Sequence, residues 1–233
     1  MRPQDRIIVA LDTSDLDRLR YLVRHLSPHV GMFKIGLELI TAIGVERAVS
    51  IVKTYSETDI GVFLDGKFCD IPNTVAAASR NVVAKGVDVF NVHASAGIDA
   101  IRAACENKGK AKVLAVTVLT SIDDANAQAI YMRDAASAAV DLGTMAVLSG
   151  ADGIICSPKE LPLFSDLKCL KVTPGVRPDW AAAQDQKRVM TPAEAVRGGA
   201  TYLVIGRPIT DPPKSIGLPA DAAERIAAEI AAA

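Results

Sequence analysis

Short apolar runs rich in β-branched residues alternate along the chain with longer amphipathic stretches, and this alternation is typical of repeated βα units. The pattern contains eight such units. The predicted strands cover residues 7–11, 32–35, 61–64, 87–92, 112–118, 153–156, 170–173 and 202–205. Eight parallel strands with intervening helices close most simply into a (β/α)₈ (TIM) barrel, so the sequence predicts an α/β fold of this type.

The stretches between the predicted strands carry apolar residues at helical spacing. Ser14 with Asp17 three residues later resembles a capping box that opens the first helix, which should end near Pro28. The Ala-rich segment 220–233 predicts a final packing helix. No Ser/Gly/Pro-rich linker or low-complexity tract interrupts the series, so we expect one catalytic barrel domain over residues 1–233.

Composition narrows the class of partner. Half of the 233 residues are hydrophobic and only 4% are aromatic, which suits a closely packed α/β core. With 26 Lys and Arg against 27 Asp and Glu, the net charge of −1 implies no broad attraction to nucleic acid or a membrane surface, and a small ligand is expected. The four cysteines are widely spaced, which predicts reduced thiols in a cytoplasmic protein. The first apolar run is too short for a signal peptide or membrane span.

Active sites of such barrels lie at the carboxyl ends of the strands, and here nearly every predicted strand end carries a polar group. These groups are Asp12, Lys34, Asp65 with Lys67, His93, Thr120 with Ser121, Ser157, Pro174-Gly175 with Arg177, and Gly206-Arg207. Polar residues are common where loops begin. Ionisable residues of both signs at the first three strand ends nevertheless favour a functional site.

Asp65 and Lys67 lie two residues apart at the end of an apolar run. In a regular strand they share a face and stand roughly 6 to 7 Å apart along the backbone. Asp70 adds another carboxylate just downstream. Charges on the inner face of a strand are costly unless they are paired or act on a ligand, so we expect this stretch to anchor the site.

Lys34 places a cation in an otherwise buried strand. Taken alone, such a lysine can simply extend its ammonium group to the rim of the barrel. Beside Asp12 and Asp65 it completes an alternating set of ammonium and carboxylate groups, in which both lysines should stay protonated at neutral pH. A Schiff-base nucleophile needs a neutral amine, so this set favours proton donation or charge stabilisation.

The loops after the last two predicted strands have the composition of a phosphate site. Gly206-Arg207 follows the eighth strand and Pro174-Gly175-Val176-Arg177 follows the seventh. Glycine lets backbone N–H groups approach a ligand, arginine offers a bidentate fork, and barrels often bind phosphate between these loops. A Gly-Arg pair by itself often only turns the chain, but its position here predicts a phosphorylated substrate.

Three other features carry weaker signals. His25 and His29 stand four apart, as in some metal pairs, but a proline lies between them and no third ligand is evident, so no metal is expected. His93 is more typical of a hydrogen-bonded lining residue than of a catalyst. Gln186 lies in the polar stretch 178–188, which could close over a ligand as a lid.

The stretch FLDGKFCDIPNT at residues 63–74 resembles the signature of the orotidine 5'-phosphate decarboxylase family. Six further segments support the resemblance: VALD at 9–12, FKIG at 33–36, NVHA at 91–94, VTVLTS at 116–121, VTPGVRP at 172–178 and VIGR at 204–207. This chain has Gly66 where the family usually has a bulky apolar residue, and Cys69 where it often has His. Neither position belongs to the charged set.

The resemblance implies a cofactor-independent homodimer that converts orotidine 5'-phosphate to UMP, the last step of pyrimidine nucleotide synthesis. Lys34, Asp65 and Lys67 would form the catalytic network, joined by Asp70 of the partner subunit, and Lys67 would protonate C6 of the pyrimidine. The resemblance also implies the substrate contacts. Asp12 and Lys34 would bind the ribose, Asp65 would face the carboxylate, and Thr120 or Ser121 would contact the pyrimidine edge. The phosphate or its closing loop would be contacted by Pro174, Arg177, Gln186, Gly206 and Arg207, and Ile71 and Thr74 would reach across the interface.

Two alternatives differ in chemistry. Magnesium-dependent sugar-phosphate lyases, such as hexulose-phosphate synthases, share the Asp-x-Lys-x-x-Asp pattern, but IPNT at 71–74 and LTS at 119–121 favour the nucleotide substrate. A non-catalytic phosphate-binding barrel is the other alternative, and the retention of every expected charge counts against it.

Overall fold

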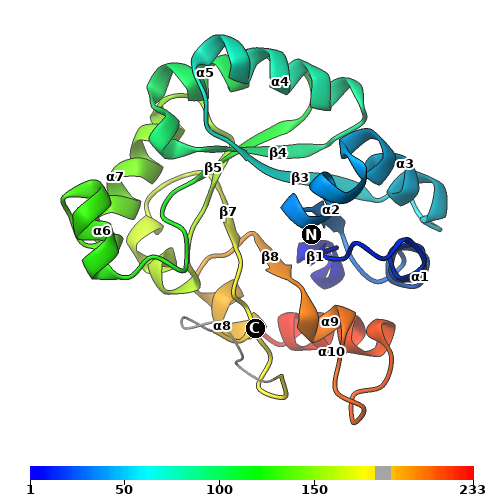
Figure 1. Cartoon of the computed structure of the whole chain (residues 1–233). Helices are drawn as coiled ribbons and strands as arrows, with labels where there is room; N and C mark the ends of the chain where they lie inside the picture. Colours follow the sequence, from blue (N-terminus) through cyan, green and yellow to red (C-terminus); the bar gives the residue numbers. More distant parts are fainter. Residues whose placement is uncertain (182–189) are drawn as a thin grey trace.

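The computed structural model describes residues 1–181 and 190–233. Its eight strands pair in parallel and in chain order, and β1 closes the barrel against β8 (Figure 1). The strands are β1 Ile7–Ala10, β2 Met32–Ile35, β3 Gly61–Phe68, β4 Val89–His93, β5 Lys112–Val116, β6 Gly153–Ile155, β7 Leu170–Thr173 and β8 Tyr202–Ile205. The predicted (β/α)₈ barrel is therefore confirmed.

Helices surround the barrel on its outer side (Figure 1). They are α1 Leu16–Leu26, α2 Leu37–Ile43, α3 Val45–Tyr55, α4 Pro72–Ala84, α5 Ile98–Glu106, α6 Asp124–Tyr131, α7 Ala135–Leu148, α8 Pro192–Arg197, α9 Arg207–Thr210 and α10 Pro219–Ala231, with the 3₁₀ helices η1 Pro3–Arg6, η2 Ala94–Ala96 and η3 Pro158–Phe164. The predicted final helix is α10, which packs against η1, α8 and α1. Across residues 1–181 and 190–233, no helix has the length and apolar character needed to cross a membrane.

The strands divide their side chains between two apolar layers. Outward residues such as Ile7 and Val9 join the layer beneath the helices. The inward layer fills the barrel with Ile8, Ala10, Phe63, Val89, Leu114, Val172 and Val204. Because strand side chains alternate, the inward face continues from Ala10 to Asp12 and from Phe63 to Asp65. The same alternation that fills the core thus delivers carboxylates to one end of the barrel, which we call the mouth.

The start of the first helix differs from the prediction. Asp15, not Ser14, is the N-cap: its carboxylate accepts hydrogen bonds from the backbone N–H groups of Asp17 and Arg18. The Ser14 hydroxyl instead donates to Glu38 at the start of α2. A carboxylate one residue later satisfies two free N–H groups at once, which a single hydroxyl at position 14 does not do.

The opposite end of the barrel, the base, contains a repeated device. One residue directly precedes each of β4, β6 and β8 and makes two hydrogen bonds to a single residue on the preceding strand. Its backbone N–H donates to the carbonyl of that strand residue, and its side-chain oxygen accepts the N–H of the same strand residue. The pairs are Asp88 with Val62, Asp152 with Val113 and Thr201 with Lys171. We call Asp88, Asp152 and Thr201 the base caps. Each follows by two positions a glycine in the left-handed region, namely Gly86, Gly150 and Gly199.

Candidate active site

A cavity of about 570 Å³ opens at the mouth of the barrel. This volume lies in the range of sites that hold a small organic ligand. Its lining brings together predicted site residues from the ends of six strands, β1, β2, β3, β5, β7 and β8: Asp12, Lys34, Asp65, Lys67, Thr120, Ser121, Pro174, Arg177, Gly206 and Arg207. Residues that are far apart in the sequence therefore meet at one concave surface, as the strand-end pattern predicts.

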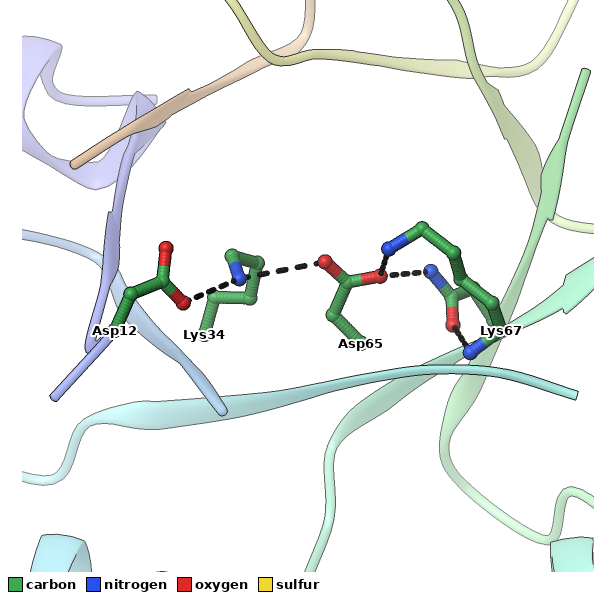
Figure 2. A network of polar contacts seen from close by, with 5 residues as sticks. Asp12, Lys34, Asp65 and Lys67 are labelled. Carbon is green, nitrogen blue, oxygen red and sulfur yellow. Dashed lines mark hydrogen bonds and ion pairs between the residues drawn. The ribbon is translucent and has the colours of Figure 1, made fainter. Parts of the chain in front are cut away.

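Charges of alternating sign run along one wall of this cavity. The Lys34 ammonium lies 3.1 Å from Asp12 Oδ1 and 3.3 Å from Asp65 Oδ2, and the Lys67 ammonium lies 2.7 Å from Asp65 Oδ1. Figure 2 shows the four side chains in this order, with Asp65 between the two lysines. We call Asp12, Lys34, Asp65 and Lys67 the charge array. Both oxygens of the Asp65 carboxylate are thus paired with cations.

The backbone that carries Asp65 and Lys67 is not the regular strand that the sequence suggested. The pairing of β3 with β4 passes from Leu64 opposite Phe90 directly to Phe68 opposite Val92. Four steps along β3 thus match two along β4, and Lys67 adopts a left-handed backbone with φ of 47°. Such bulges redirect side chains near active sites. The bulge turns the Lys67 side chain so that its ammonium contacts Asp65. The expectation that these two residues simply alternate along a regular strand is therefore wrong here.

Asn91 lies at the centre of this region, although the sequence pattern alone predicts no role for it. Asn91 lies on β4 with 0% of its surface exposed. Its amide Nδ2 donates to Asp65 Oδ1 at 2.7 Å, and its Oδ1 accepts the backbone N–H of Lys67 at 2.7 Å. The only sequence signal is a polar residue inside the apolar run 89–92, and such residues need partners when buried.

The surroundings set the charge of the two neighbouring titratable groups. Burial favours a raised pKa for Asp65, but the charges of Lys34 and Lys67 and the hydrogen bonds from Lys67 and Asn91 outweigh it and lower the pKa. Burial, followed by the charge of Lys67, lowers the pKa of His93. At neutral pH Asp65 is therefore ionised and His93 is neutral. His93 lies outside the cavity lining, and its Nδ1 contacts the Ser95 hydroxyl at 2.7 Å.

Gly36 leaves the space that one ion pair occupies. A Cβ atom at this position would lie 2.7 Å from Lys34 Nζ and 2.9 Å from Asp12 Oδ1. Gly36 has an extended backbone that other residues also adopt, so the requirement comes from the neighbouring charges. The absence of a side chain at position 36 lets the Lys34 ammonium stand beside Asp12.

The loops after β7 and β8 form another part of the lining, where the sequence predicts a phosphate site. Pro174, Gly175 and Arg177 come from the first loop, and Gly206 and Arg207 from the second. Gly175 has φ of 77°, a conformation that favours glycine, and it turns the chain into the cavity wall. Two guanidinium groups in this lining suit a phosphate dianion.

Three of the predicted site residues that the structure describes do not line the cavity in this single chain. Asp70, Ile71 and Thr74 are exposed and lie at the start of α4, outside the cavity lining. Gln186 lies outside the described residues. Within the described part of the chain, no group of three or more metal-ligating side chains converges. His25 instead contacts the Tyr21 carbonyl, and His29 pairs with Glu224.

Comparison with known proteins gives a consistent result. Residues 5–226 match the profile of the family described as "Orotidine 5'-phosphate decarboxylase / HUMPS family". The chain is 45% identical over 240 residues to the orotidine 5'-phosphate decarboxylase of Geobacter sulfurreducens, covering 98% of this chain and 97% of the relative. It is also 45% identical over 244 residues to that of Moorella thermoacetica, covering 99% and 94%. The crystal structure of orotidine 5'-phosphate decarboxylase from Lactobacillus acidophilus is similar, with a TM-score of 0.80, 32% identity, and coverage of 96% and 98%.

Proposed function

Because the chain belongs to the orotidine 5'-phosphate decarboxylase / HUMPS family, we propose that the cavity at the mouth is the place where its reaction occurs. This reaction is the decarboxylation of orotidine 5'-phosphate to UMP, a carboxy-lyase step of pyrimidine biosynthesis. The observation that carries the proposal is the contact of 2.7 Å between Lys67 and Asp65 inside a cavity of nucleotide size. This contact supports a role for Lys67 as a proton donor beside the Asp65 carboxylate.

In the proposed mechanism, the bond between C6 and the carboxylate breaks and carbon dioxide leaves. The electron pair stays on C6, and the Lys67 ammonium donates a proton to it, which yields UMP and a neutral amine that regains its proton from solvent. Asp65 faces the substrate carboxylate and disfavours the charged ground state. The lowered pKa of Asp65 supports this role, because the residue stays ionised in the cavity.

The remaining lining residues bind the rest of the nucleotide. Asp12 and Lys34 hold the ribose hydroxyls, and Thr120 or Ser121 contacts the pyrimidine edge. The phosphate contacts are assigned to Arg177, Gly206 and Arg207, with Pro174 in the same wall. Gln186, which lies outside the described residues, is assigned to the phosphate as well. The arrangement of the charge array and the arginines in one cavity supports this assignment.

The magnitude of the barrier requires that these groups act together. One ammonium about 4 Å from a carbanion supplies at most about 4 kcal/mol at an effective dielectric constant near 20. Demanding enzymatic reactions need barrier reductions of up to about 23 kcal/mol. Binding energy from the distant phosphate must therefore help to expel water and hold the charge array rigid.

The test of this proposal is the Lys67→Ala variant. Its kcat should fall roughly 10³-fold or more, because the proton donor is lost. UMP binding, measured by calorimetry, should remain detectable, since the phosphate and ribose contacts persist. Substantial decarboxylation, followed by the loss of orotidine 5'-phosphate absorbance, would remove Lys67 from this role. Wild-type activity should survive a chelator, whereas a magnesium-dependent lyase would lose its activity.

We further propose that the protein is a homodimer in which Asp70, Ile71 and Thr74 reach the site of the partner. Five of the large exposed apolar side chains support this assembly, with exposed fractions between 43% and 77%: Leu37, Ile71, Ile98, Ile130 and Met132. They follow β2, β3, β4 and β5, which are adjacent in the barrel. Exposed apolar residues gathered near one part of a mouth are typical of an interface.

A mixing experiment tests the shared site. Lys67→Ala and Asp70→Ala homodimers should each be nearly inactive. If Asp70 acts in the partner's site, each mixed dimer contains one intact site and one doubly substituted site. Equal amounts, after subunit exchange, should regain about a quarter of wild-type activity, as expected for a two-fold symmetric dimer. No recovery in a mixture shown to contain mixed dimers would place Asp70 in its own chain's site or outside the site.

Two wider proposals accompany these. Residues 1–233 act as one catalytic domain, and the protein works in the cytoplasm. The free thiols of all four cysteines support a reducing compartment. Labelling of these thiols in freshly lysed cells, without added reductant, would test the location.

A further inference from the structure

Asn91 connects the two partners of the proposed proton-donor pair. We propose that Asn91 is a positioning residue, which holds the Asp65 carboxylate and the Lys67 backbone in the geometry needed for protonation. This inference rests on the proposed role of Lys67. It concerns how the donor is aimed, and it assigns Asn91 no contact with the substrate.

The contacts around Asn91 form a closed set. Its amide donates to Asp65 Oδ1, its carbonyl oxygen accepts the Lys67 N–H, and the Lys67 ammonium returns to the same Asp65 oxygen, each at 2.7 Å. Asn91 therefore uses both ends of its side chain on the two residues. Because the amide is fully buried, water does not replace these bonds.

The bulge explains why a side chain is needed here. The β3–β4 pairing passes from Phe90 to Val92, and Asn91 lies between these two residues. Its side-chain oxygen accepts the Lys67 N–H at the point where the regular pairing is interrupted. Lys67 also has a left-handed backbone, which is strained for a non-glycine residue and persists only when its surroundings enforce it. Asn91 is the side chain placed to enforce it.

The orientation of Asp65 depends on the same amide. Asp65 Oδ1 accepts from Lys67 and Asn91, while Oδ2 faces Lys34. The two lysines are flexible, but Asn91 is short and buried on a strand, so it fixes the plane of the carboxylate. Without it, Asp65 can rotate and carry the Lys67 ammonium away from C6. A misplacement of about 1 Å can cost roughly 10²-fold in rate.

The decisive variant is Asn91→Asp, which has nearly the same shape. When its carboxyl is protonated, it can donate to Asp65 and accept the Lys67 N–H, as asparagine does. When ionised, it repels Asp65 and loses the donor. The charged or titratable groups near it are Asp65 and Lys67 on β3, Lys34 on β2 and His93 on β4; burial and Asp65 raise the pKa of the new carboxyl, and the lysines oppose this.

We expect kcat of Asn91→Asp to be roughly 10²-fold below wild type above neutral pH. The ratio of variant to wild-type kcat should rise as the pH falls, while UMP affinity stays within about threefold. Asn91→Ala should show a comparable loss of kcat, and its ratio of variant to wild-type kcat should not change with pH. Ser79→Ala, which removes another fully buried hydrogen-bonded side chain on α4, is the matched control and should keep wild-type kcat.

Several outcomes would overturn the inference. They are wild-type kcat in both Asn91 variants, a kcat ratio of Asn91→Asp that is constant with pH, and a loss confined to UMP affinity. If neither variant folds, as judged by circular dichroism, while Ser79→Ala does, the role of Asn91 is structural and the inference also fails. Different results would overturn the proposed function: a wild-type protein that does not decarboxylate orotidine 5'-phosphate, or a Lys67→Ala variant that still does.

Discussion

The mouth and the base of the barrel both contain Asp–Lys ion pairs, but they use the carboxylates differently. At the base, Asp152 accepts the backbone N–H of Val113 at 2.8 Å and contacts Lys108 and Lys112. At the mouth, Asp65 takes its hydrogen bonds from the side chains of Lys67 and Asn91. A carboxylate bonded to backbone holds strands together, whereas one bonded to side chains lines a cavity and can act on a ligand.

The titration behaviour of the two carboxylates does not separate them. Burial favours a raised pKa for Asp152, but the hydrogen bonds of Lys108 and Val113 lead the interactions that lower it. The pKa of Asp65 is lowered for a similar balance of reasons. A shifted pKa therefore marks a paired carboxylate at either end of the barrel. The partners and the adjoining cavity distinguish the functional pair from the structural one.

Among the variants that compare the mouth with the base, loss of a phosphate contact should produce the largest effect. Arg207→Ala should lower kcat/KM roughly 10²- to 10³-fold, because each hydrogen bond to a charged group contributes about 1.5–3 kcal/mol and a guanidinium can make two with a phosphate. Part of this loss should appear in kcat, since phosphate binding energy supports the geometry of the array. Steady-state kinetics provide the measurement, with Lys112→Ala at the base as the control. Unchanged kcat at saturating substrate would separate the phosphate site from catalysis.

A smaller effect is expected from crowding one ion pair at the mouth. Gly36→Ala should displace the Lys34 ammonium from Asp12, because the new methyl group would fall within 3 Å of both. Since these residues are assigned to the ribose, kcat/KM should fall roughly 10- to 100-fold while the unfolding temperature stays near wild type. Kinetics and thermal unfolding test this together. Wild-type kinetics would show that Lys34 keeps its function after moving.

The base should respond in stability instead of activity. Asp152→Ala leaves the buried N–H of Val113 without its side-chain acceptor and should cost about 2 kcal/mol, or roughly 4–8 °C in Tm. The kcat value should stay within about twofold of wild type, because Asp152 lies at the other end of the strands. Asp152→Asn, which keeps an acceptor, should lose less. A large loss of kcat in folded Asp152→Ala would contradict the division between the two ends.

The smallest effect is a difference in acid stability. Because the folded-state pKa of Asp152 is lowered, its contribution is complete above the ordinary value of about 3.9 and is lost as the pH falls through the lowered value. Asp152→Asn cannot lose this contribution, so its stability should fall less steeply below about pH 4. Denaturant unfolding at a series of acidic pH values would measure the slopes. Identical slopes would mean that other carboxylates dominate acid unfolding.

The sequence predicted those parts of the molecule that depend on periodicity. Apolar runs located all eight strands, and alternation carried Asp12 and Asp65 to the mouth. It did not predict the bulge before Phe68, because the bulge depends on pairing with β4 and not on local propensity. Asn91 was missed for the same reason: its partners lie more than twenty residues away in the chain.

The base caps have a consequence for how such a barrel can assemble and diversify. They occur before three of the four even-numbered strands, β4, β6 and β8, and each ties that strand to the one before it. A pair of adjacent strands therefore contains the hydrogen bonds that fix its own register, and it can pair correctly during synthesis before the barrel closes. Recombination between related genes at these boundaries would exchange strand pairs whose register is already fixed. The loops at the mouth could then change while the base of the barrel stays the same.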